Sequence, residues 1–292
     1  MEEVFDVGIR KYQVLIGMAQ RASTIGRLDI ALFAVSLLSR YLAAPRENHL
    51  ALTLHLLFRY LKKNPNQRIV LDSRPLLVDD GLCSNSFHPD FLGGYPDATE
   101  DVASDFPTAY YGTELETAVF FDTDHAHDHI TRCSISGLIV FVGSTPVIWQ
   151  STRQGRGCFA TSTYCAEFMS MRSVDEEAIS ISYMLRCLRI PVCRPTDLYG
   201  DNFGVIQSAE IPEGDLKEKH IAFSYHYVRE AIAAKFVNTH LCRSAENFAD
   251  ICTKALGSNI FVDLVNELMA QGGVWAGEEA WSTGMALAHT VE

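Results

Sequence analysis

The sequence has 292 residues, of which 48% are hydrophobic and 21% are charged. This composition is typical of a folded globular protein and excludes collagen-like, low-complexity and wholly disordered chains. At this length the chain forms one large domain or two of ordinary size. The formal net charge of −12 argues at first against nucleic acid as a partner, because phosphate binding needs clustered Lys and Arg.

The negative charge is concentrated in the middle of the sequence. Residues 69–124 carry 12 acidic side chains and 1 basic one, whereas residues 1–68 carry 10 basic and 5 acidic ones. Residues 125–292 carry 13 basic and 19 acidic side chains. The average charge therefore hides a basic N-terminal segment that is followed by a strongly acidic one.

Targeting signals and cysteine usage bear on the compartment. The acidic start Met1-Glu-Glu3 differs from the basic start of a signal peptide, and the longest apolar stretches, 30–38 and 138–149, are shorter than the ~18 residues of a membrane span. The 8 Cys residues include no C-x-x-C pair, which predicts reduced thiols. We therefore expect a cytoplasmic or nuclear protein with no membrane partner.

The N-terminal 72 residues are predicted to be mainly helical. Residues 29–42 begin with an acid, place apolar residues at helical spacing and are followed by Pro45, so they predict a helix that packs on a neighbour. A second helix is expected from about residue 45 to 63, with a basic last turn. Residues 68–72 are expected to form a short strand.

Residues 73–116 have little periodicity, many turn formers and an acidic excess, so we expect a linker or insertion there. Residues 272–292 are expected to be a mobile tail. Between these segments, residues 117–271 predict an α/β domain with a mixed sheet. Its strands are expected at 117–122, 136–142, 146–150, 197–200 and 236–241, and its helices at about 163–189, shortly after 201, 220–234, and from about 246 and 258.

Four acids stand where these elements meet. Asp122 ends the first strand, Glu167 lies in the first turn of the long helix, Asp201 ends the fourth strand, and Asp250 lies near the start of a late helix. If the first and fourth strands are parallel neighbours, Asp122 and Asp201 emerge at the same edge of the sheet. Clustered carboxylates stay ionised around a cation, and oxygen ligands favour Mg²⁺ or Mn²⁺.

Such a site suits phosphodiester hydrolysis, in which two metals about 4 Å apart activate water and stabilise the leaving oxygen. The alternative is structural. Acids commonly cap helices and solvate strand ends, and the chain has 36 of them.

An ordered series of motifs resembles the Pol polyprotein of copia-like retrotransposons, in its ribonuclease H region and the end of the reverse transcriptase before it. Asp122-Thr-Asp-His-Ala126 is similar to the family's D-A-D-W-A, and Ser162-Thr-Tyr-Cys-Ala-Glu-Phe-Met-Ser170 to its S-S-T-E-A-E-Y-M-A. The further matches are Ser134-Ile-Ser-Gly-Leu-Ile-Val-Phe-Val-Gly143, Asp201-Asn-Phe-Gly-Val-Ile206, Lys219-His-Ile-Ala-Phe-Ser-Tyr-His-Tyr-Val-Arg-Glu230 and Ala249-Asp-Ile-Cys-Thr-Lys254.

The resemblance implies a ribonuclease H-like fold, a mixed five-stranded sheet with flanking helices, preceded by a small helical thumb-like region. It implies that Asp122, Glu167, Asp201 and Asp250 bind two Mg²⁺ or Mn²⁺ ions. The implied reaction is endonucleolytic hydrolysis of the RNA strand of RNA/DNA hybrids. Polymerase activity is not expected, and the missing polymerase part of the same polyprotein is a possible partner.

Further residues are candidates for proton transfer and substrate contact. His240 lies on the strand that leads to Asp250, where some ribonuclease H enzymes keep a His that shuttles protons. Its alternative reading is a strand-end His with no catalytic role. The candidate substrate-binding residues are Arg153, Arg156, Asn202, Lys219 and Arg229.

Two other functions stay open. Departures from the family pattern near the site, such as His125 for Trp and Phe203-Gly204 for Gln-Ser, favour a catalytically decayed or co-opted remnant that acts as an interaction module. The second possibility is a transition-metal site formed by His125, His127 and His129, which alternate along an expected loop.

Overall fold

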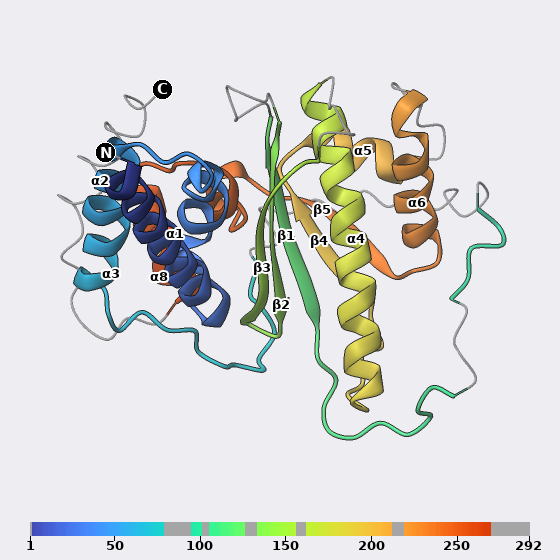
Figure 1. The fold of residues 1–292 in the computed structure, drawn as a ribbon. Helices are drawn as coiled ribbons and strands as arrows, with labels where there is room; N and C mark the ends of the chain where they lie inside the picture. Colours follow the sequence, from blue (N-terminus) through green and yellow to red (C-terminus); the bar gives the residue numbers. More distant parts are fainter. Residues whose placement is uncertain are drawn as a thin grey trace. The chain divides into compact units, whose positions relative to one another are not determined.

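A computed structural model describes residues 2–78, 95–100, 105–125, 133–155, 162–211 and 219–269. The chain divides into two compact units, whose helices and strands are drawn in Figure 1. The first unit comprises residues 1–70, 149–153 and 251–292, and the second comprises residues 71–148 and 154–250. No helix among the described residues combines the length and the apolar character that a membrane crossing requires.

The first unit is helical, as predicted, but the two helices predicted at residues 29–42 and 45–63 are irregular. It contains α1 (Glu2–Ile25), α2 (Glu47–Leu52), α3 (Arg59–Lys63) and α8 (Ser258–Leu268). In place of one α-helix over residues 29–42 there are short 3-10 and π turns at Leu28–Ile30, Leu32–Leu37 and Ser39–Tyr41, and a π segment, Thr53–Phe58, joins α2 to α3. The Leu38 carbonyl accepts hydrogen bonds from the Tyr12 hydroxyl and the Tyr41 amide, so this turn is tied to α1.

A buried polar cluster organises the first unit. The Arg27 guanidinium lies 2.7 Å from Oδ2 of Asp29, a side chain with 0% exposure, and the Tyr60 hydroxyl donates to the same oxygen at 2.7 Å. Burial and then the Asp29 charge raise the pKa of Tyr60. Phe261 of α8 makes an edge contact with the Tyr60 ring. Helix α8 therefore packs with the N-terminal helices, although the sequence grouped it with residues 117–271.

The chain contains a mixed five-stranded sheet, as predicted. Its strands are β1 (Thr117–Asp124), β2 (Ile135–Val142), β3 (Thr145–Arg153), β4 (Thr196–Gly200) and β5 (Val237–Leu241), in the order β3-β2-β1-β4-β5. Strand β1 is antiparallel to β2 and parallel to β4, which is parallel to β5. Residues 68–72, which were expected to form a strand, are not a strand of this sheet.

Helices α4 (Thr163–Cys187) and α6 (Ala222–Ala233) cover one face of this sheet, and α5 (Phe203–Glu210) follows β4 (Figure 1). Helix α4 begins where the Ser162 hydroxyl accepts a hydrogen bond from the Cys165 amide, at 3.1 Å. This is the preferred role of Ser at an N-cap. The helix ends before Arg189, which has a φ of 62°, and Pro191 lies just beyond it.

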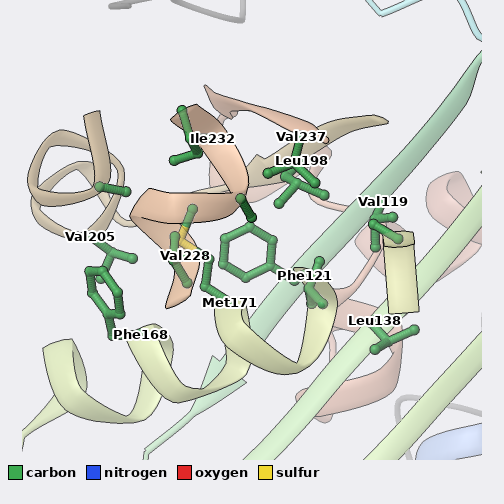
Figure 2. Packing of buried hydrophobic residues seen from close by; sticks show 14 of the residues in the cluster. Val119, Phe121, Leu138, Phe168, Met171, Leu198, Val205, Val228, Ile232 and Val237 are labelled. Atoms are coloured by element: carbon green, nitrogen blue, oxygen red, sulfur yellow. The ribbon is translucent and has the colours of Figure 1, made fainter. Parts of the chain in front are cut away.

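The core of the second unit lies between α4, α6 and the sheet (Figure 2). The strands contribute Val119, Phe121, Leu138, Leu198 and Val237, and the helices contribute Phe168, Met171, Val205, Val228 and Ile232. Each of these large side chains stabilises the fold by roughly 1.5–3 kcal/mol when buried. This packing fixes α4 on β1, and with it Glu167 near the start of α4.

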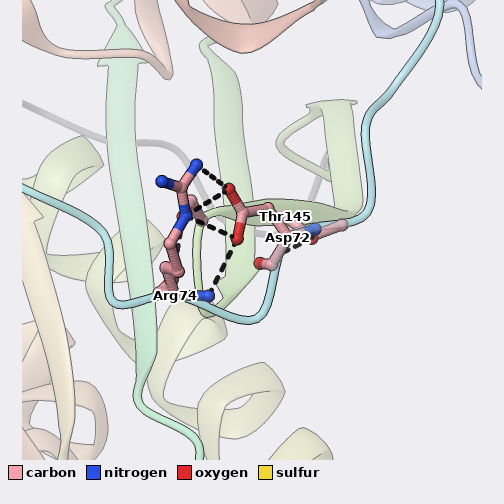
Figure 3. Close-up of polar contacts among 4 residues, drawn as sticks. Asp72, Arg74 and Thr145 are labelled. Atoms are coloured by element: carbon pink, nitrogen blue, oxygen red, sulfur yellow. Dashed lines mark hydrogen bonds and ion pairs between the residues drawn. The ribbon is translucent and has the colours of Figure 1, made fainter.

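Residues 72–74 are held by hydrogen bonds beside the turn between β2 and β3 (Figure 3). The Asp72 amide donates to Oγ1 of Thr145 at 2.6 Å, and the Asp72 carboxylate pairs with the guanidinium of Arg74. Hydrogen bonds from the Arg74 side chain and backbone lower the pKa of Asp72 to about 2. Gly143 has a φ of 60°, and a Cβ there would lie 2.9 Å from the Asp72 carbonyl oxygen, so this turn requires glycine.

The described parts of the expected linker are bound to the second unit. Glu100 forms an ion pair with Arg186, and Oε1 of Glu116 lies 2.8 Å from the guanidinium of Arg194. The Tyr111 amide donates to the Arg189 carbonyl at 2.8 Å. The acidic side chains therefore pair with arginines at and beyond the C-terminal end of α4.

Candidate metal centre

Strand pairing brings Asp122 and Asp201 to one edge of the sheet. In the parallel ladder of β1 and β4, Phe120 is the partner of Tyr199. Asp122 and Asp201 each lie two residues after these partners. Asp201 directly follows β4, and Asp122 lies in β1, two residues before the strand ends at Asp124. The parallel arrangement that the sequence analysis required for these two acids is therefore present.

Glu167 enters the same region from α4, just after the first turn of the helix. The start of this helix is held by Gln154, whose Nε2 donates to the Ala166 carbonyl at 3.0 Å and to Oγ of Ser136 at 2.8 Å. The backbone N–H of Gln154 also donates to the Ser134 carbonyl at 2.9 Å. Gln154 thus links the residue before Glu167 to strand β2.

Asp122, Glu167 and Asp201 converge. Each offers one carboxylate oxygen, and these three oxygens lie within 4.8 Å of one another. Asp122 is 1% exposed, Glu167 is 4% exposed, and Asp201 is half-buried. Bringing ionised carboxylates together under burial is costly without a compensating cation. Because every donor is a hard oxygen, the three residues fit Mg²⁺ or Mn²⁺ better than zinc.

Asp250 belongs to a neighbouring turn and is not one of these three residues. It is the first residue of α7 (Asp250–Thr253) and is 6% exposed. Upstream in this turn, Nδ2 of Asn247 donates to the carbonyl of Phe121 at 2.9 Å. The ring of Phe248 packs edge-on against Phe120, with 4.8 Å between the ring centroids. The turn that carries Asp250 is thus attached to the residue before Asp122.

Three polar residues around the carboxylates were missed by the sequence analysis. The Ser244 hydroxyl donates to Oδ2 of Asp201 at 2.6 Å, Asn247 bonds the β1 backbone, and Gln154 holds the start of α4. Ser244 and Asn247 lie between β5 and Asp250, where Ser and Asn are ordinary turn residues. Their position in a loop that ends at a candidate ligand was the available signal.

His240 makes its contacts with Asp197 and Tyr199 of β4. It is 8% exposed, its Nε2 lies 2.9 Å from Oδ1 of Asp197, and its ring stacks on Tyr199 with 4.9 Å between centroids. Asp197 lies four residues before Asp201 on the same strand. His240 is therefore a neighbour of the strand that carries Asp201 and is not among the three converging residues.

The candidate substrate-binding residues differ in their settings. Arg153 is the exposed last residue of β3, and Lys219 is exposed at the start of a 3-10 turn, Lys219–Ile221. Asn202 is the N-cap of α5, and its Oδ1 accepts from the Val205 amide at 3.3 Å. Arg156 lies outside the described residues.

Arg229 is 3% exposed and serves the fold. Its Nη1 donates to the carbonyls of Ser208 and Ile211, at 2.8 and 2.6 Å, and its guanidinium lies over the Tyr225 ring. These carbonyls are at the C-terminal end of α5, where a cation is favourable. The guanidinium is thus occupied inside the second unit and not presented to a ligand.

Of the three histidines considered as a transition-metal site, His125 is described. It is half-buried, and its Nδ1 lies 3.5 Å from Oγ of Ser134. His127 and His129 lie outside the described residues.

Comparisons with known proteins agree with the resemblance seen in the motifs. No protein-family model matches the chain. The chain is 26% identical over 258 residues to the retrovirus-related Pol polyprotein from transposon RE1 of Arabidopsis thaliana, covering 88% of this chain and 15% of the relative. It is 26% identical over 251 residues to the corresponding polyprotein from transposon RE2 of the same plant, covering 86% of this chain and 14% of the relative. The chain therefore spans about one seventh of the length of these curated relatives.

Among solved structures, the chain is similar to the N-terminal RNase H domain of a Mycobacterium tuberculosis protein, determined as a fusion with maltose-binding protein. The TM-score is 0.37 with 14% sequence identity, and the match covers 53% of this chain and 98% of that chain.

Proposed function

We propose that this chain, a homologue of the retrovirus-related Pol polyproteins of copia-like transposons, is a ribonuclease H-type endonuclease that cleaves the RNA strand of RNA/DNA hybrids. The observation that carries the proposal is the convergence of Asp122, Glu167 and Asp201 within 4.8 Å. These residues come from three separate elements, β1, α4 and the end of β4, and two of them are almost fully buried. Helix capping or solvation of strand ends would explain each acid singly, but neither role requires three carboxylates to converge.

In this proposal Asp122, Glu167 and Asp201 hold divalent cations, two Mg²⁺ or Mn²⁺, and Asp250 completes the second position. Bound metal supplies an activated water and stabilises the charge that develops on the leaving oxygen. Glu167 additionally orients the water near the 2′-hydroxyl of the RNA strand. The anchoring of Asp122 by its strand and of Glu167 by Gln154 supports this role, because fixed ligands lose little freedom when a cation binds.

Proton transfer by His240 requires a change in its contacts. The Nε2 of His240 is engaged with Asp197, so this contact must break before the ring can serve the reacting groups. We propose His240 as a residue that acts after such a rearrangement, during proton transfer or product release.

For substrate binding, the exposed Arg153 and Lys219 are proposed to contact phosphates, and Asn202 to contact the hybrid beside Asp201. Hybrids are recognised largely through their shape, their phosphates and the 2′-hydroxyl of the RNA strand. The polymerase that would produce the hybrid is proposed to be another part of a polyprotein of this kind, because this chain matches 15% of such a relative.

The test uses the purified chain with a labelled RNA/DNA hybrid and Mg²⁺. We expect cleavage by the unmutated chain and its loss in Asp201→Asn, which keeps the shape of the ligand and removes its charge. Asp263→Asn, the same change at an exposed position of α8, is the matched control and should cleave normally.

Equal cleavage by Asp201→Asn, or no Mg²⁺-dependent cleavage by the unmutated chain, would refute the proposal. Tight binding of the hybrid without cleavage would instead favour a co-opted interaction module.

A further inference from the structure

The turn between β5 and α7 touches the carboxylate group through a side chain that the proposed chemistry does not use. The Ser244 hydroxyl donates to Oδ2 of Asp201 at 2.6 Å, a length typical of a hydrogen bond to an ionised carboxylate. A carboxylate offers about four lone-pair positions. Asp201 can therefore accept this bond and ligate a cation at the same time.

We propose that Ser244 is a positioning residue that orients the Asp201 carboxylate for divalent cation binding; this rests on the proposed function of the site. A hydrogen bond to one oxygen fixes the rotation of the carboxylate about its last side-chain bond. Residues that hold metal ligands in this way commonly change metal affinity when they are removed. Asp201 depends on such help, because it is the least buried of the three converging acids.

Ser244 can orient Asp201 because its own turn is fixed at several points. The Cys242 amide donates to the carbonyl of Gly200 at 2.9 Å, immediately before Asp201. Further along the turn, Nδ2 of Asn247 bonds the Phe121 carbonyl at 2.9 Å, and Phe248 packs against Phe120. The hydroxyl is thus presented from a turn that is tied to both β4 and β1.

The same turn ends at Asp250, 6% exposed at the start of α7. Residues 242–250 therefore contact Asp201 at one end and carry the fourth candidate ligand at the other. We therefore expect loss of the Ser244 hydroxyl to weaken cation binding at Asp201.

The test compares Ser244→Ala, Ser244→Thr and a matched control, Ser173→Ala. Ser173 is an exposed serine of α4 whose hydroxyl bonds a backbone carbonyl of its own helix. Mn²⁺ binding to the full chain is measured by calorimetric titration, alongside the Mg²⁺ concentration that gives half-maximal hybrid cleavage. We expect Ser244→Ala to weaken Mn²⁺ binding by about 10-fold, Ser244→Thr to restore it, and Ser173→Ala to leave it unchanged.

Thermal unfolding without metal separates a folding defect from a positioning defect, because Ser244→Ala should unfold like the unmutated chain under these conditions. Unchanged Mn²⁺ affinity in Ser244→Ala would overturn the inference even if the unmutated chain cleaves hybrids. Ser244-dependent Mn²⁺ binding by a chain that does not cleave would refute the proposed nuclease and leave the inference standing. A chain that binds no Mn²⁺ would refute both.

Discussion

The ring of Phe121 occupies the space in which a side chain at Gly200 would lie. A Cβ atom at position 200 would come within 2.5 Å of the Cζ atom of Phe121. Since Asp122 follows Phe121 and Asp201 follows Gly200, this close approach lies directly beside both acids.

Gly200→Ala is therefore expected to lower the free energy of unfolding by about 1–3 kcal/mol, because the added methyl must displace a ring in a packed core. It should also reduce hybrid cleavage, since Asp122 is attached to the displaced residue. Urea unfolding measures the first effect. Gly17→Ala is the control: Gly17 is an exposed position within α1 with no atom within 4 Å of an added Cβ, so alanine should stabilise the chain by about 0.5–1 kcal/mol. Equal effects of the two substitutions would contradict the Phe121 contact.

Asn202 has a structural role that can be separated from its proposed contact with substrate. Its side chain caps α5 through the Val205 amide. Asn202→Ala should cost about 1 kcal/mol in unfolding free energy, whereas Asn202→Asp keeps a capping oxygen and should cost little. If Asn202 also contacts the hybrid, both variants should raise the KM for cleavage. If Asn202→Asp lowers the unfolding free energy as much as Asn202→Ala does, the side chain does not stabilise the chain by capping α5.

The Tyr60 hydroxyl is expected to contribute strongly to the first unit, because its acceptor is the fully buried carboxylate of Asp29. Tyr60→Phe removes this donor and leaves the packing of the ring on Phe261. We expect a loss of about 1.5–3 kcal/mol in chemical denaturation. Tyr110→Phe, at an exposed tyrosine, should change stability by less than about 0.5 kcal/mol. Similar values for the two variants would show that the Asp29 bond contributes nothing.

Asp175 should make the second unit less stable as pH rises. This side chain of α4 has 0% exposure, and neither carboxylate oxygen has a hydrogen-bond partner among the described residues. Burial first, and the charge of Glu176 second, raise the pKa of Asp175 well above its usual range. The folded chain therefore keeps a proton that the unfolded chain releases above about pH 4.

The contribution of Asp175 to the free energy of unfolding is therefore fully present below about pH 4. It is lost as the pH rises toward the pKa of Asp175 in the folded chain, by up to about 1.4 kcal/mol per pH unit. Asp175→Asn is neutral at every pH and should remove this part of the slope in urea titrations between pH 5 and 8. The charged and titratable groups that interact with Asp175 are Glu176 of α4 and Tyr227 of α6. A slope unchanged in Asp175→Asn would contradict a buried proton, and Asp263→Asn serves as the exposed control.

Local chemistry explains which parts of the fold were predictable. Ser162 before an apolar run predicts the start of α4, and the short apolar runs on either side of Gly143 predict β2 and β3. The convergence of Asp122 with Asp201 was predictable from strand ends once a parallel pair was assumed, and Glu167 followed from the motif. These features depend on residues that are close in sequence or on one simple rule of sheet topology.

Features that depend on distant packing were not predictable. The π and 3-10 turns over residues 28–41 interrupt a clean helical pattern, because carbonyls there accept bonds from other elements, as Leu38 does from Tyr12. The burial of Arg229 could not be read from its charge, and the Ser244 contact joins residues 43 positions apart. The hydrophobic periodicity of a sequence carries no information about a contact between such distant residues.

The pairing of Glu100 with Arg186 has an electrostatic consequence for the carboxylate group at the other end of α4. Glu167 and Arg186 are separated by about 28 Å along the helix, at about 1.5 Å of rise per residue. The Debye length at physiological ionic strength is about 8 Å. The charge of Glu100, paired with Arg186, is therefore screened at the distance of Glu167, and it contributes little to the potential that a polyanionic strand would meet at the carboxylate group.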